Sequence, residues 1–194
     1  DGTINTISYL WAKTRDMTGI GLFGYLLDAK IDSLNITNAE MKGDGIVGVI
    51  AGGILQAGEK RYASSISNCS VSSATVCGYD EGDNIRSTMM MGGILGGLDL
   101  NAIAIISSCK IDDTTINATC NAGGIVGFHQ TGATAENCYT TQETAIATAE
   151  GTVSKVETKT ADQFASGEVA YLLGGVWGQN IDNDQPPQTV PALN

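Results

Sequence analysis

His129 is the only histidine of the chain, and it follows the glycine-rich stretch NAGGIVGF at residues 121–128. A glycine loop beside a histidine could bind a phosphate and supply a general base. A P-loop, however, requires a lysine and a serine or threonine after its last glycine, and Phe128 stands there instead. No Gly-x-Ser-x-Gly segment supplies a nucleophile either. We therefore expect His129 to lie at an exposed bend and not in a catalytic centre.

Carboxylates are the next residues that could do chemistry, and they gather in the segment YDEGDN at residues 79–84. Two carboxylates held about 5–10 Å apart can hydrolyse a glycosidic bond. The same segment, and DNDQ at residues 182–185, are rich in the oxygen ligands that Ca²⁺ prefers, although neither has the spacing of an EF-hand loop. We expect the acids to form a solvated surface and no cofactor to be bound, with a structural Ca²⁺ as the alternative.

The charge of the chain excludes some partners. Its net charge is −11, and its ten Lys and Arg residues are scattered, with Lys60-Arg61 as the only adjacent pair. Nucleic-acid binding requires clustered basic side chains, so we expect no nucleic-acid partner. No apolar run approaches the roughly 20 residues of a membrane-spanning helix, and we expect no membrane insertion.

The abundant glycines follow a repeat. A block of Gly, two large apolar residues and Gly occurs four times, and a six-residue block with apolar or small residues at positions one, four and six follows. Such self-similarity indicates a repeat architecture. The 48 residues between the second and third copies of the first block leave room for two units. The first blocks are GLFG (21–24), GIVG (45–48), GILG (93–96) and GIVG (124–127), and the second are IDSLNI (31–36), ISNCSV (66–71), ISSCKI (106–111) and AENCYT (135–140).

The spacing within the second block predicts how its side chains are placed. Positions four and six alternate as in a strand, and a bend before position four would turn position one inward as well. Strands joined by bends, with glycines supplying unusual backbone conformations, predict an all-β, right-handed β-helix-like solenoid. Position four then forms an inward ladder of small or apolar side chains, whose cysteines we expect to remain mostly free thiols. The ladder residues are Leu34, Cys69, Cys109 and Cys138.

These blocks resemble a known family. Gly-apolar-apolar-Gly followed by NCS or NCY, together with the opening DGTINTISYL and the closing ADQFASGEVAYLLGGVWGQNI, is similar to the GLUG-motif repeats of bacterial surface and secreted proteins, especially those of Bacteroidetes. The resemblance covers nearly the whole chain. It implies a β-helix-like, adhesin-like module of irregular repeats, and it carries no catalytic residue over to this chain.

The chain divides into three parts by its patterning. We expect the repeat solenoid at residues 1–151, a C-terminal strand and helical cap at 152–181, and an extended tail at 182–194. Thr160 and Gln163 have the spacing of a capping box, so a helix begins there. The apolar residues that follow would cover the open end of the core, because solenoids need caps. They are Phe164, Val169, Leu172 and Leu173.

Two stretches interrupt the repeat, at residues 55–65 and 77–91, and we expect them to protrude from one side of the solenoid. Long connections in a compact domain are often functional, and aromatic rings suit contacts with sugars. The candidate ligand-binding residues are Tyr62, Tyr79, Asp80 and Asp83.

Together these features predict a non-enzymatic, secreted or cell-surface module for adhesion, binding a glycan or a host or bacterial surface protein. Any signal peptide or anchor would lie outside this segment. A polysaccharide lyase or glycoside hydrolase built on a β-helix is the first alternative, and a passive spacer within a larger adhesin is the second.

Overall fold

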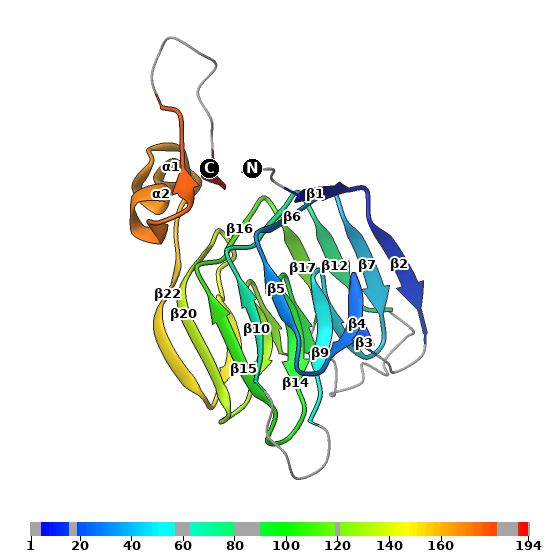
Figure 1. Ribbon diagram of the computed structural model, residues 1–194. Coiled ribbons are helices and arrows are strands. Elements are labelled where there is room, and N and C mark those ends of the chain that lie inside the picture. Colours follow the sequence, from blue (N-terminus) through cyan, green and yellow to red (C-terminus); the bar gives the residue numbers. More distant parts are fainter. Residues whose placement is uncertain are drawn as a thin grey trace.

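The chain passes repeatedly through the same four sheets, and each strand lies beside the equivalent strand of the previous passage (Figure 1). The computed structural model describes residues 5–15, 19–56, 63–79, 90–118, 121–181 and 190–193. The four sheets are named in the order in which the chain first enters them: sheet A begins with β1, sheet B with β2, sheet C with β3 and sheet D with β4, and the next strand, β5, returns to sheet A. We call one such passage from A through B, C and D and back to A a circuit. All strand pairs between circuits are parallel. The predicted all-β class is confirmed.

The circuits follow one another along the chain. The first contains β1 (Asn5–Ser8), β2 (Trp11–Thr14), β3 (Gly19–Ile20), β4 (Phe23–Leu26) and β5 (Lys30–Asp32). The second contains β6 (Leu34–Thr37), β7 (Glu40–Gly43), β8 (Ile46–Gly48), β9 (Ala51–Ile54) and β10 (Ala63–Ser67). The third contains β11 (Ser70–Ser72), β12 (Thr75–Cys77), β13 (Met90–Gly92), β14 (Leu95–Leu98) and β15 (Ile103–Ser107). The fourth contains β16 (Lys110–Asp112), β17 (Thr115–Asn117), β18 (Ala122–Gly123), β19 (Val126–His129) and the first half of β20 (Ala133–Thr140). The second half of β20, β21 (Ile146–Ala149) and β22 (Thr152–Thr158) add a last, partial circuit.

The six-residue blocks align across sheet A as the sequence predicts. Ile66 pairs with Ile31 and Ile106, and Ile106 pairs with Ala135. A non-glycine residue with positive φ forms the bend at the third position of each block, where φ lies between 51° and 57°. Short polar side chains tolerate this conformation best because they can hydrogen-bond locally. The bend residues are Ser33, Asn68, Ser108 and Asn137.

The glycine blocks align differently from the prediction. Phe23 pairs with Ala51, and Ala51 with Leu95, so the second circuit's equivalent of GLFG is VIAG at residues 49–52 and not GIVG at 45–48. The long interval therefore contains one circuit with two insertions and not two units. The first insertion connects sheet D to sheet A after β9, and the second connects sheet B to sheet C after β12. Contrary to the prediction, the flanking strands therefore do not place both insertions on one side of the molecule.

The repeat glycines serve close packing and not bending. None of them has a positive φ. A Cβ on Gly48 would lie 2.1 Å from the Ala51 carbonyl oxygen and 2.6 Å from the Gly96 nitrogen. A Cβ on Gly96 would lie 2.6 Å from the Gly52 oxygen. At these glycines, sheets C and D thus approach backbone to backbone, in a contact that we call the glycine seam, and a side chain there would not fit.

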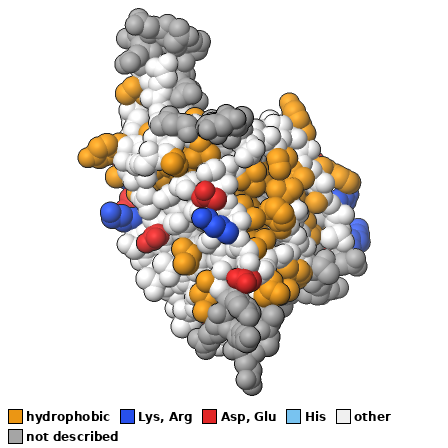
Figure 2. All heavy atoms as spheres, viewed as in Figure 1, with side chains coloured by type: hydrophobic (Ala, Val, Ile, Leu, Met, Phe, Trp, Pro, Cys, Tyr) orange, Lys and Arg blue, Asp and Glu red, His pale blue; other side chains and the backbone are white. Residues whose placement is uncertain are grey.

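The four sheets together enclose an apolar core of inward-facing residues from every circuit. Cys69, Cys109 and Cys138 are fully buried in it, and Leu34 packs against it partly buried. None of these three cysteines is in a disulfide. Figure 2 shows hydrophobic side chains gathered where the first circuit lies, and that circuit supplies most of the partly buried apolar residues.

The C-terminal cap packs on the outside of sheet A and not over the end of the core. Helices α1 (Ala161–Ala165) and α2 (Glu168–Leu173) lie beside β20 and β22 (Figure 1). The predicted capping box of Thr160 and Gln163 is present. Cap residues cluster on Tyr139, which faces away from the core because its neighbour Cys138 faces inward. The apolar members of this cap cluster are Tyr139, Phe164, Val169, Leu173, Trp177 and Leu193.

Beyond the last circuit, a groove of about 360 Å³ remains at the end of the core, lined by residues of β21 and β22 and the approach to β21. The tail also differs in part from the expected extended segment, since β24 (Ala192–Leu193) pairs antiparallel with β23 (Trp177–Gly178). Across the described ranges, neither helix is long and apolar enough to cross a membrane.

Candidate functional site

Only one of the four predicted ligand-binding residues can be placed. Tyr79 lies just after β12, half-buried, at the start of the second insertion. Tyr62, Asp80 and Asp83 lie outside the described residues, as do residues 80–84 and 182–185 of the two candidate Ca²⁺ segments. Elsewhere in the described ranges, no group of three His, Cys, Asp or Glu residues is arranged to hold a metal ion. Tyr79 is therefore the starting point for the site.

His129 does not lie at the exposed bend that the sequence predicts. It is the last residue of β19, pairs with Ala149 and is fully buried. Neither ring nitrogen has a hydrogen-bond partner within the described part of the chain. Burial without a partner disfavours the charged imidazolium and lowers the pKa of His129. Its enclosure keeps His129 out of any surface site.

Three cationic side chains surround the ring of Tyr79. Lys42 Nζ lies 4.8 Å from the ring centroid, and Lys13 Nζ lies 5.5 Å from it. The guanidinium carbon of Arg15 lies 4.8 Å from the same centroid. All three fall within the range of about 6 Å at which a cation is attracted to an aromatic face. We call Lys13, Arg15, Lys42 and Tyr79 the Tyr79 cluster.

Strand register in sheet B brings the cluster together. Lys13 of β2 pairs directly with Lys42 of β7, and Lys42 pairs with Cys77 of β12. Alternation along each strand turns these side chains outward, since their neighbours Ala12, Met41 and Val76 belong to the core. Tyr79 follows Cys77 by two residues, and its backbone N–H donates to Asp44 Oδ1 at 3.3 Å.

The adjacent lysines are electrostatically unfavourable by themselves. Side chains directly opposite in neighbouring strands lie about 5 Å apart, and like charges there destabilise a sheet. The negative face of the Tyr79 ring compensates part of this repulsion. Two carboxylates are also close in the fold: Asp44, which holds Tyr79, and Glu40, which pairs with Trp11 at the other end of the face.

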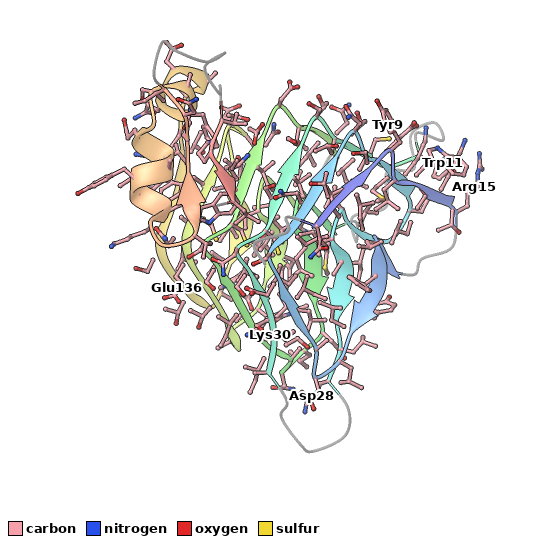
Figure 3. The ribbon with its side chains drawn as sticks, turned by 45° about the horizontal axis from the view of Figure 1, so that its top comes forward. Tyr9, Trp11, Arg15, Asp28, Lys30 and Glu136 are labelled. Carbon is pink, nitrogen blue, oxygen red and sulfur yellow. The ribbon has the colours of Figure 1, made fainter. Side chains whose placement is uncertain are left out.

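Trp11 adds an exposed aromatic ring to the same face. Its side chain is 63% exposed, and it precedes Lys13 by two residues on β2, so both point the same way. Figure 3 shows Trp11 and Arg15 projecting from β2 away from the body of the molecule, with Tyr9 nearby. We call Trp11 together with the Tyr79 cluster the sheet B face.

Basic residues that are scattered in the sequence meet on this face. Lys13 and Lys42 are far apart in the sequence, but the circuit between them spans 29 residues, as shown by the pairing of Ile7 with Ile36. Adding the same 29 residues to Lys13 gives Lys42. The predicted blocks do not give this offset, since the first two copies of the glycine block lie 24 residues apart and those of the six-residue block lie 35 residues apart. The cluster therefore follows from the strand register of sheet B and not from the sequence pattern.

Comparison of the chain with protein-family models, with curated proteins and with solved structures gives no match.

Proposed function

We propose that this chain is a non-enzymatic binding module of a secreted or cell-surface bacterial protein. In this proposal the circuits form a right-handed β-helix-like solenoid of GLUG-type repeats. Support for the fold comes from the uninterrupted parallel pairing from β1 through β6, β11 and β16 to β20, and from the aligned six-residue blocks. Regular scaffolds of this kind offer extended surfaces for ligands.

The sheet B face is the proposed binding surface, and the Tyr79 cluster is the observation that supports it. Cations and aromatic rings hold and orient a ligand, whereas glycoside hydrolysis requires a pair of carboxylates. Both lysines and Trp11 sit on paired strands and not on loops, so the spacing of their backbone positions is fixed before a ligand arrives. Such preorganisation reduces the entropy lost on binding. A glycan or the surface of another protein would suit this combination of groups.

A glycan array tests the proposal, with turnover assays on the same polysaccharides run in parallel. We expect specific binding by the wild-type chain, and a loss of about tenfold or more in affinity for Trp11→Ala and Tyr79→Ala, as for aromatic residues at the centre of an interface. Tyr171→Ala is the matched control, because Tyr171 is an exposed aromatic residue of α2 in the cap (86% exposed).

Each other outcome contradicts part of the proposal. Product formation in the turnover assays would show that the chain is an enzyme. Binding that Tyr171→Ala weakens as much as Tyr79→Ala would place the surface elsewhere. Absence of binding to any glycan or surface protein would leave a passive spacer as the better description.

A further inference from the structure

We infer that the ligand of the sheet B face is an acidic polysaccharide, whose carboxylate or sulfate groups bind between Lys13 and Lys42. This inference rests on the proposed function and specifies its ligand class. Three observations carry it: the concentration of positive charge, the direct opposition of the two lysines, and the exposed ring of Trp11 beside them.

Positive charge is rare in this molecule and is concentrated here. The chain carries ten Lys and Arg residues against 21 Asp and Glu residues. Nevertheless, three of the ten cations meet over a single aromatic ring. In a strongly acidic protein, this concentration of positive charge makes the sheet B face the candidate anion site among the described residues.

The positive charges of Lys13 and Lys42 are not balanced by ion pairs with other described residues. Within the described residues, ion pairs join Lys110 to Asp112, and Lys159 to Glu157 and Glu168, while Lys13 and Lys42 form none. Two ammonium groups on directly paired residues repel each other, and the parallel ladder prevents the strands from separating. An anionic group placed between them would remove this repulsion and accept hydrogen bonds from both, which makes charge-assisted binding favourable.

Trp11 determines what kind of anion fits. Two residues of strand separate it from Lys13, about 6.6 Å along the strand. A sugar ring resting on the exposed indole could therefore present its own acidic group, or that of the next sugar, to Lys13 and Lys42. A small inorganic anion would use the lysines but leave the indole uncovered. Glu40, which pairs with Trp11, limits the anion-binding part of the face to the Lys13 end.

A long polyanion with closely spaced phosphates suits the site less well. Duplex nucleic acid requires several cations along its backbone, and beyond this cluster the protein is acidic. A polysaccharide carries its charges at wider intervals, between sugars that can stack on Trp11. The surface chemistry therefore favours an acidic glycan over a nucleic acid.

Affinity measurements with matched polysaccharides test the inference on the full chain. The probes are a uronate polymer such as polygalacturonate, a sulfated polymer such as chondroitin sulfate, a neutral galactan and duplex DNA. We expect one or both acidic polysaccharides to bind and the neutral galactan to bind at least about tenfold more weakly. Raising NaCl from about 0.1 M to about 0.5 M should weaken the acidic interaction, because exposed charges are then screened.

A double variant identifies the lysines. Lys13→Gln with Lys42→Gln should reduce acidic-polysaccharide affinity by about tenfold or more. Lys30→Gln with Lys155→Gln is the matched control, since it removes the same charge from two exposed lysines of β5 and β22. In Figure 3, Lys30 lies well away from Trp11 and Arg15. Thermal unfolding of both double variants checks that each is folded.

The outcomes separate the inference from the proposed function. Uronate binding alone identifies a carboxylate ligand, and sulfated binding alone a sulfate ligand. The neutral galactan could instead bind as tightly as the acidic polysaccharides. If Trp11→Ala then abolishes this binding and the Lys13/Lys42 variant keeps it, the inference is overturned and the proposed function stands. Lysine-dependent binding of DNA with equal affinity would overturn it in favour of nucleic acid. If no acidic polysaccharide binds, the inference is wrong.

Discussion

At the scale of single residues, His129 shows how burial alone changes the behaviour of a titratable group. Both nitrogens of its ring are enclosed without partners in the described structure, so the ring must be neutral to be stable there. The unfolded chain has no such restriction, and its histidine takes up a proton near pH 6.5. Stability therefore depends on pH through this one side chain.

We predict that the free energy of unfolding decreases as pH falls from about 6.5, where the unfolded state begins to bind a proton, through the lower pKa of folded His129. The decrease should be absent or much smaller in His129→Leu, which removes the titrating ring. Urea unfolding followed by circular dichroism at pH 7.5 and 5.0 measures it. An identical decrease in the variant would show that other groups are responsible.

Asp32 titrates in a lower pH range than His129 and does not interfere with the measurement on His129. A hydrogen bond from Ser67 Oγ at 2.7 Å, with another from Asn68 Nδ2 at 2.9 Å, lowers the pKa of the Asp32 carboxyl. Because its pKa is lowered by folding, its contribution to stability is present above the unfolded value near 4 and is lost only as pH falls below it. Measurements at pH 5 and above therefore separate the titration of His129 from that of Asp32, and the His129→Leu variant separates it from the titration of other groups.

At the scale of elements, the glycine seam sets the distance between sheets C and D. The contacts join backbone atoms of one circuit to those of the next, as Gly96 does with Gly52 and Val47. Backbone cannot move aside as a flexible side chain can, so an added methyl group must displace a strand. Overpacking of this kind typically costs about 1–3 kcal/mol.

Gly96→Ala should therefore destabilise the protein by about 1–3 kcal/mol or prevent folding. Gly24→Ala is the matched control, because Gly24 occupies the same file in the first circuit and its nearest contact to an added Cβ is 3.1 Å. Urea unfolding of both variants provides the comparison, and soluble expression is the readout if Gly96→Ala fails to fold. Equal stability of the two variants would contradict the seam.

At the scale of the whole molecule, three buried cysteines lie at equivalent positions of successive circuits. Cys69, Cys109 and Cys138 are all fully buried in the continuous core. Burial raises the pKa of the Cys109 thiol, which further reduces its reactivity because the thiolate is the nucleophile. Cys77, in contrast, is half-buried on the outward side of sheet B.

We predict that a maleimide reagent labels Cys77 in the native protein, whereas the three core thiols react only when the circuits open. Peptide mass spectrometry over a range of urea concentrations distinguishes the sites. A common urea midpoint for the three thiols would indicate cooperative opening, and a sequence of midpoints would indicate opening one circuit at a time. Rapid native-state labelling of Cys109 would contradict its position in the core.

The sequence predicted those parts of the molecule in which one local pattern repeats without interruption. The six-residue blocks, from Ile31 to Thr140, align in sheet A because apolar spacing alone determines which side chains face inward. The glycine blocks were misaligned in the second circuit, because GIVG at 45–48 matches the motif but VIAG at 49–52 occupies the equivalent position. The glycine motif alone therefore selects the wrong one of these two segments, which lie four residues apart.

The candidate site was only partly predictable. Tyr79 was identified from its place at an insertion, but its cationic neighbours depend on strand register across two circuits. His129 was misplaced because its burial depends on the chain that covers it, including Gly151, where an added Cβ would lie 2.7 Å from the His129 ring. Long-range contacts of this kind leave no local trace in the sequence.

The glycine seam also has an evolutionary consequence. A substitution in the seam is destabilising because a side chain would separate the two backbones, whereas the outward positions of sheet B contribute nothing to the core. Lineages of this molecule are therefore expected to retain the seam while their sheet B faces diverge. One inherited framework could in this way present many different surfaces.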